Sequence, residues 1–266
     1  MAVTDKYLDS NNDSNNLLHA AHEFAEELTQ ALQFFEENPP KILLSATRLK
    51  GRQVVAMRFA KNEGSLGVLN LRSKEWPVLG LIIEFHCGWD SHRRYLAVEK
   101  SSLTVTPHGR ENADPLFRVE YVKEQDSHRP SSHIHVHAHR DEFTHLMGFA
   151  SKFDVERTKK VRNYFRRGTR LAELHFPTGG HRFRPCLEDV LEMLRVEFKL
   201  DVDNSKWQQH LRTARESWRR TQLAAAVRDC PDEALRVLVD EYGMPEPIGW
   251  TLPEFDTAWQ KKFARS

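Results

Sequence analysis

The stretch Ser131-Ser132-His133-Ile134-His135-Val136-His137-Ala138-His139 places four histidines in strict alternation with three apolar residues. Side chains of a β-strand point alternately to its two faces. The pattern therefore predicts a strand with its histidines on one face and its apolar residues toward a core. Same-face neighbours lie about 7 Å apart, which lets adjacent imidazoles share a metal ion, a phosphate or a proton. This stretch predicts both a sheet and a candidate site on it.

Short apolar segments separated by turn residues extend this sheet toward the N-terminus. We expect strands at 54–60, 66–71, 79–85, 95–98, 103–106 and 116–121, with a hairpin turn at Asn62-Glu63-Gly64 between the first two. Short strands joined by short turns indicate an antiparallel meander. Such a sheet packs one face, so the histidine row is expected in an open concavity or beneath a helix.

Helical periodicity flanks the sheet and divides the chain into four regions. Residues 1–16, rich in Asn, Asp and Ser, are expected to form a disordered tail, and residues 17–40 an N-terminal helix ended by Pro39-Pro40. Residues 41–184 form a His-rich antiparallel sheet region with helices inserted between Asp141 and Gly168. Residues 185–266 form a helical C-terminal region that closes with a helix at 255–263. The predicted fold class is α+β, an antiparallel β-sheet with an N-terminal helix and a helical C-terminal region.

The net charge of +1 conceals a separation of charge along the chain. Residues 1–40 carry eight acidic residues and one lysine, whereas residues 157–184 carry nine basic residues and one glutamate. A solvated helix surface is the simplest interpretation of a charge run, but this density favours an anionic partner such as nucleic acid. The acidic N-terminal helix is a candidate docking surface for a protein. The expected phosphate contacts are Arg162, Arg166, Arg167, Arg182 and Arg184.

The composition excludes several classes of protein. No apolar run approaches the roughly 20 residues that span a bilayer, and the polar N-terminus has no secretory signal, so we expect a cytoplasmic protein without membrane segments. Three widely spaced cysteines argue against both a disulfide framework and a thiolate zinc site.

The first chemistry that the histidines suggest is metal binding. Two histidines at i and i+2 on a strand can bind zinc or iron(II), with a third ligand from another element. The segment 137–142 resembles the first metal motif of cupins and 177–181 their second, which implies a metal-dependent enzyme on a cupin-like sheet. The candidate metal ligands are His135, His137 and His139, and further candidates are His175, Asp141, Glu142 and Glu173.

The second chemistry is general acid-base catalysis, which needs no metal. Histidine titrates near neutrality, and a pair beside a phosphodiester can move the protons that RNA cleavage requires. The candidate catalytic residues are His133, His135 and His137, supported by Arg118 and His175. The alternative is that the row forms a polar strand surface without catalytic function.

Two resemblances bear on these hypotheses. The segment 116–121 (LFRVEY), followed by the loop to Ser132-His133-Ile134-His135, resembles the end of the sheet in TumE-family toxins, small ribonucleases of bacterial toxin-antitoxin pairs. This resemblance covers about residues 42–139. The whole chain is similar to uncharacterised bacterial proteins with a His-x-His-x-His strand and a helix start like that at Gly179–Val190.

The leading prediction is a nucleic-acid-binding protein, with the resemblance to TumE-family toxins implying a histidine-dependent ribonuclease of a toxin-antitoxin or defence type. The alternatives are a metal-dependent enzyme and a non-catalytic interaction protein.

Overall fold

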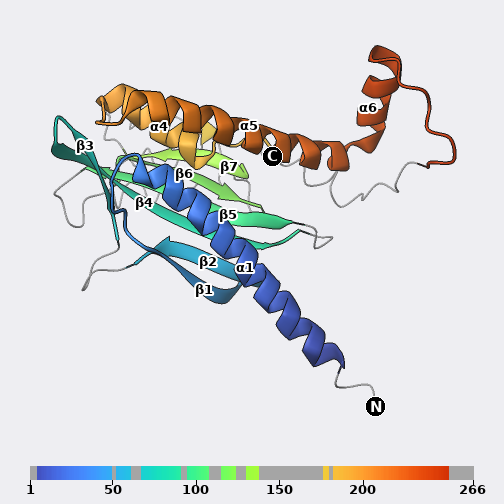
Figure 1. Ribbon diagram of the computed structural model, residues 1–266, viewed down its shortest axis with the longest axis horizontal. Helices are drawn as coiled ribbons and strands as arrows, with labels where there is room; N and C mark the ends of the chain where they lie inside the picture. Colours follow the sequence, from blue (N-terminus) through green and yellow to red (C-terminus); the bar gives the residue numbers. More distant parts are fainter. Residues whose placement is uncertain are drawn as a thin grey trace, which may run out of the picture.

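The fold is α+β, as the sequence predicts. The computed structural model describes residues 5–49, 52–60, 67–90, 95–107, 115–123, 130–137, 176–179 and 182–251. One long helix, α1 (Asp5–Gln33), precedes an antiparallel sheet, and further helices follow it (Figure 1).

The described strands form an eight-stranded sheet in which every neighbouring pair is antiparallel. The order is β1-β2-β4-β5-β6-β7-β8, with β3 beside β4, so the histidine strand β7 lies between β6 and β8. The strands are β1 (Ile42–Leu49), β2 (Arg52–Phe59), β3 (Leu69–Ser73), β4 (Trp76–Trp89), β5 (Leu96–Pro107), β6 (Phe117–Val122), β7 (Ser132–Val136) and β8 (Phe176–Pro177).

The pairing of β4 differs from the expected meander. Both β2 and β3 pair with β4, β2 along 84–87 and β3 along 76–81, so the predicted hairpin between 54–60 and 66–71 is wrong. The physical reason is that β4, at 14 residues, is long enough for two strands to lie end to end along one edge. The predicted turn at 62–64 lies outside the described residues.

The helices follow the predicted regions with shifted ends. Helix α1 begins at Asp5, so it includes most of the segment 1–16 that was expected to be disordered. Its packed part begins at Leu17, where the buried positions recur every three or four residues. The C-terminal elements are α4 (Leu187–Phe198), α5 (Asn204–Asp229), α6 (Pro231–Arg236) and the short π-helix η2 (Val237–Glu241). The helices expected within 141–168 and at 255–263 lie outside the described residues.

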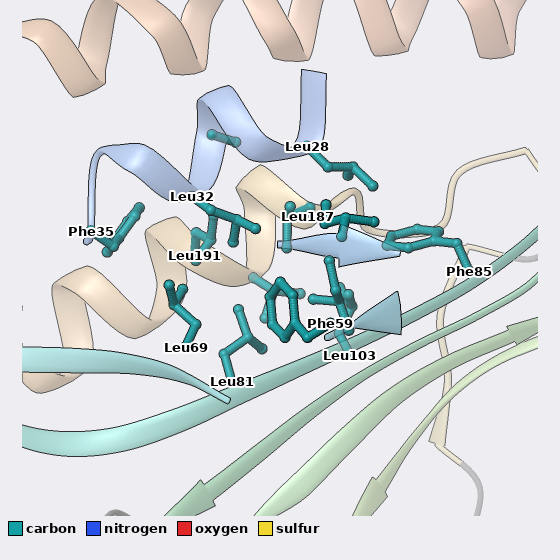
Figure 2. Packing of buried hydrophobic residues seen from close by; sticks show 14 of the residues in the cluster. Leu28, Leu32, Phe35, Phe59, Leu69, Leu81, Phe85, Leu103, Leu187 and Leu191 are labelled. Carbon is teal, nitrogen blue, oxygen red and sulfur yellow. The ribbon is translucent and has the colours of Figure 1, made fainter. Parts of the chain in front are cut away.

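The hydrophobic core lies between one face of the sheet and the helices α1, α4 and α5. Leu32 of α1 and Leu191 of α4 are fully buried against sheet residues such as Leu81 and Leu103 (Figure 2). Trp207 of α5 is also fully buried, and its Nε1 donates a hydrogen bond of 2.7 Å to Glu192 Oε2 on α4. Each such side chain contributes about 1.5 to 3 kcal/mol by leaving water, so this face anchors the sheet.

The opposite face of the sheet is polar, and we call it the polar face. One row of directly opposed residues crosses five strands on it: Arg58, Glu84, Ser102, Glu120 and His133. These residues alternate along their strands with the core residues, so the two faces are separated by the period-two pattern of each strand. Ser102 and His133 are 7% and 1% exposed, so the part of the row on β5 and β7 is shielded from solvent, whereas Arg58 on β2 is exposed.

None of the described helices is both long enough and apolar enough to cross a membrane.

Candidate metal centre on the polar face

Strands β6 and β7 bring four polar side chains together by their register. Both strands alternate polar and apolar residues, and the antiparallel pairing sets Arg118 opposite His135 and Glu120 opposite His133. Directly opposed residues have Cβ atoms about 4.5 to 5.5 Å apart, so their side chains can meet above the sheet. The apolar residue between the histidines, Ile134, packs against the core on the other face.

The side chain of His133 is held by a hydrogen bond to the backbone just before β7. Its Nδ1 lies 2.8 Å from the carbonyl oxygen of Pro130, and the side chain is almost fully buried. A carbonyl oxygen can only accept, so Nδ1 carries the hydrogen and donates it. In the neutral ring Nε2 is then the bare nitrogen. A hydrogen bond of this kind orients metal-binding histidines in proteins.

Three ligand atoms converge at the other end of this imidazole. His135 Nε2 lies 2.9 Å from His133 Nε2 and 2.8 Å from Glu120 Oε2, and His133 Nε2 lies 3.6 Å from the same oxygen. Atoms that each lie about 2.0 to 2.2 Å from one ion are about 2.8 to 3.6 Å from one another in octahedral or tetrahedral geometry. The three separations therefore fit one face of the coordination shell of a single divalent ion.

The surroundings of Glu120 keep its carboxyl group ionised, so a negative charge lies beside His133 and His135. Burial by itself raises the pKa of the carboxyl, but the contacts with the imidazoles of His133 and His135 and the charge of Arg118 outweigh it. The pKa of Glu120 is therefore held well below its usual range. Arg118 Nη1 donates to Glu120 Oε1 at 3.2 Å, which leaves Oε2 directed at the histidines.

The structure brings one member of the predicted ligand set, His135, together with two residues outside that set. Among the described residues, the group whose ligand atoms converge consists of Glu120, His133 and His135. His137 follows β7 and is not in that group; its backbone N–H donates to Leu116 O at 2.9 Å. His139 and His175 lie outside the described residues, as do Asp141, Glu142 and Glu173.

Two of the five arginines expected at phosphate have structural partners. Arg182 donates to both carboxylate oxygens of Asp229 on α5, at 2.6 and 2.9 Å. Arg184 is buried, with its guanidinium 3.9 Å from the ring centre of Tyr121 and 4.9 Å from that of Trp218. These contacts join the loop to α5 and the sheet, so they do not support phosphate binding at either residue. Arg162, Arg166 and Arg167 lie outside the described residues, and their role stays a prediction.

Glu120 was not identified as a candidate ligand from the sequence. The available signal was the spacing Arg118-x-Glu120 on the strand next to the histidine strand, which puts both charged residues on the polar face. A second group was missed altogether: Glu84 and His86 on β4, with Arg58 and Lys100 on the neighbouring strands.

No protein-family model, no curated protein and no solved structure matches this chain. The resemblance to TumE-family toxins stays a prediction.

Proposed function

We propose that this chain is a metal-dependent enzyme that holds one divalent ion, zinc or iron(II), between Glu120, His133 and His135. The observation that carries the proposal is the convergence of His133 Nε2, His135 Nε2 and Glu120 Oε2 within 3.6 Å of one another. In the neutral state His133 Nε2 and Glu120 Oε2 each present a lone pair, and His135 Nε2 does so when its hydrogen lies on Nδ1. A cation on which all three lone pairs can act is therefore a better partner than the groups are for one another.

Such a site supplies catalytic chemistry because three protein ligands leave coordination positions open. A zinc ion held in this way lowers the pKa of a bound water and polarises a substrate oxygen. Two histidines and one carboxylate on one face of an iron(II) ion are the arrangement of oxygen-activating non-haem iron sites. The burial of His133 and His135 strengthens both effects by excluding water from the ion's surroundings.

Metal titration of the purified, chelator-stripped protein tests the proposal. We expect one zinc per chain, with affinity reduced at least about tenfold in Glu120→Gln, His133→Gln and His135→Gln. His86→Gln is the matched control, because it removes another buried histidine of the same face while leaving the three ligands. Retention of full affinity by the three ligand variants would contradict the proposal. If His137→Gln lost zinc affinity while His133→Gln retained it, the result would favour the ligand set expected from the sequence.

A second candidate function is metal-free cleavage of RNA by a protein of the cytoplasm. The observation that favours it is the same pair of histidines, 2.9 Å apart, with Glu120 and Arg118 beside them, because this group contains an acid, a base and a cation. The burial of His133, which is 1% exposed, favours the metal-dependent function over RNA cleavage, since an ion reaches a buried nitrogen more easily than a nucleic-acid strand does.

Chelation separates the two candidates. Ribonuclease activity that survives complete removal of metal, is lost in His135→Gln, and needs low salt would support the second candidate. Activity that returns only when zinc or iron(II) is restored would support the metal centre.

A further inference from the structure

A second charged cluster lies on the polar face, centred on Glu84 of β4. A single carboxylate oxygen, Glu84 Oε1, lies 2.7 Å from His86 Nε2, 2.8 Å from Arg58 Nη2 and 3.4 Å from Lys100 Nζ. The three partners come from β2, β4 and β5, so the register of three strands assembles the cluster.

The charges of this cluster do not balance. Arg58 and Lys100 carry two permanent positive charges, and both act on the one negative charge of Glu84. Burial raises the pKa of Glu84, but its hydrogen bonds to Arg58 and His86 and the charge of Lys100 lower it to about 2. The carboxylate is thus fully ionised at neutral pH, and among the residues of this cluster that the structure describes a net positive charge remains that an anion would balance.

His86 adds an unsatisfied polar atom to this positive cluster. The residue is 9% exposed, and its Nδ1 is buried without a hydrogen-bond partner among the described residues. Leaving such an atom unpaired costs about 1 to 3 kcal/mol, and a bound ligand is one way in which proteins satisfy it. This nitrogen can accept a hydrogen in the neutral ring or donate one in the protonated ring.

The cluster lies two strands away from the proposed metal centre on the polar face. Glu84, Ser102 and Glu120 are directly opposed on adjacent strands, so the two carboxylates are two strand spacings apart, about 10 Å. Ser102, which lies between them, is polar and small. A hollow lined by Lys100, Val54, Gly88 and Val122, among others, lies beside Lys100. A substrate that reaches both sites would have to span about 10 Å.

We propose that Arg58, Lys100 and His86 bind a terminal phosphate of the substrate, whose reacting group lies about 10 Å away at the metal centre. The part of this inference that concerns the substrate rests on the proposed metal-dependent function. A phosphate monoester suits this cluster better than a carboxylate or a phosphodiester does. Near neutral pH it carries both an O–H that can donate to His86 and charged oxygens that can accept from Arg58 and Lys100.

Titration calorimetry on the metal-free, full-length protein tests the subsite apart from the metal. The probes are inorganic phosphate and methyl phosphate, compared with dimethyl phosphate and acetate. We expect the first two to bind, and to bind at least about tenfold more weakly to Arg58→Gln and Lys100→Gln. Arg48→Gln is the matched control, because it removes the same charge from β1, where the side chain is exposed.

A variant that is expected to bind phosphate more tightly controls for variants that lose binding because they fail to fold. Glu84→Gln removes the carboxylate that Arg58 and Lys100 share, so it should bind phosphate more tightly than the wild type. Absence of phosphate binding, unchanged affinity in Arg58→Gln and Lys100→Gln, or equally tight binding of dimethyl phosphate would each overturn the inference. The affinities for zinc and iron(II) are measured on the same samples. Wild-type protein that binds phosphate but neither metal ion would refute the metal-dependent function and leave the phosphate site standing.

Discussion

The Nε2 atoms of His133 and His135 lie 2.9 Å apart, and their ring centres 4.7 Å, although residues two apart on a strand start about 7 Å apart. The two rings therefore lean toward each other and toward Glu120 rather than standing parallel. Both rings also approach Glu120 Oε2, at 3.6 and 2.8 Å. The proposed metal ion would lie where these atoms converge, and the predictions below follow from that proposal and from the polar face around it.

The two histidines should differ in their importance for folding. His133→Leu leaves the carbonyl of Pro130 without its donor and Glu120 without one of its partners, so we expect a loss of about 2 to 3 kcal/mol in the free energy of unfolding. His135→Gln keeps a donor that can reach Glu120 and should lose less than about 1 kcal/mol. Urea unfolding of metal-free protein measures both. Equal losses would show that the backbone contact of His133 contributes nothing.

Glu84 predicts a specific dependence of stability on pH. Its folded-state pKa, lowered to about 2 from 4.5, makes the ionised side chain stabilising above pH 4.5, and this contribution is lost as the pH falls toward 2. The side chain is 26% exposed, so we expect about 1 to 3 kcal/mol. Glu84→Gln should flatten this part of the curve of unfolding free energy against pH. Parallel curves for the variant and the wild type would contradict the lowered pKa.

Arg184 should act as a structural residue rather than as a phosphate contact. Lysine keeps the charge but cannot lie flat against Tyr121 and Trp218, so Arg184→Lys should lower the free energy of unfolding by about 1 to 2 kcal/mol. Calorimetric melting measures this loss. The exposed Arg212→Lys on α5 is the control. An Arg184→Lys variant that melts like the wild type but binds RNA more weakly would restore the phosphate role expected from the sequence.

Alternation and periodicity were enough to predict the fold class and most elements. The strands around 116–121 and 131–139 were recognised because their polar and apolar residues alternate, and that pattern also placed Arg118, Glu120 and the histidines on one face.

The errors arose where long-range pairing overrides local signals. Separate strands are expected from the sequence at 95–98 and 103–106, but both belong to the single strand β5, in which Ser102 lies opposite Glu84 and Glu120 on the polar face. The β3–β4 turn at Lys74-Glu75 has positive φ at both residues and lacks the usual glycine. Asp201, distant in sequence, accepts hydrogen bonds from both of its backbone N–H groups, which no local pattern reveals.

The candidate metal centre could be predicted only in part for the same reason. Two candidate ligands come from one strand and follow from its pattern, but the third depends on the register of β6 against β7. A shift of that register by one residue would move Glu120 to the other face. The sequence therefore indicated candidate ligands C-terminal to the histidines, whereas the structure places the third candidate on the preceding strand.

Anomalous scattering from crystals grown with zinc tests the central claim most directly. The account predicts one strong zinc peak about 2.0 to 2.2 Å from Glu120 Oε2, His133 Nε2 and His135 Nε2, and no peak in crystals of the His135→Gln variant. A zinc peak bound by other residues, or none near these three atoms at stoichiometric zinc, would contradict it.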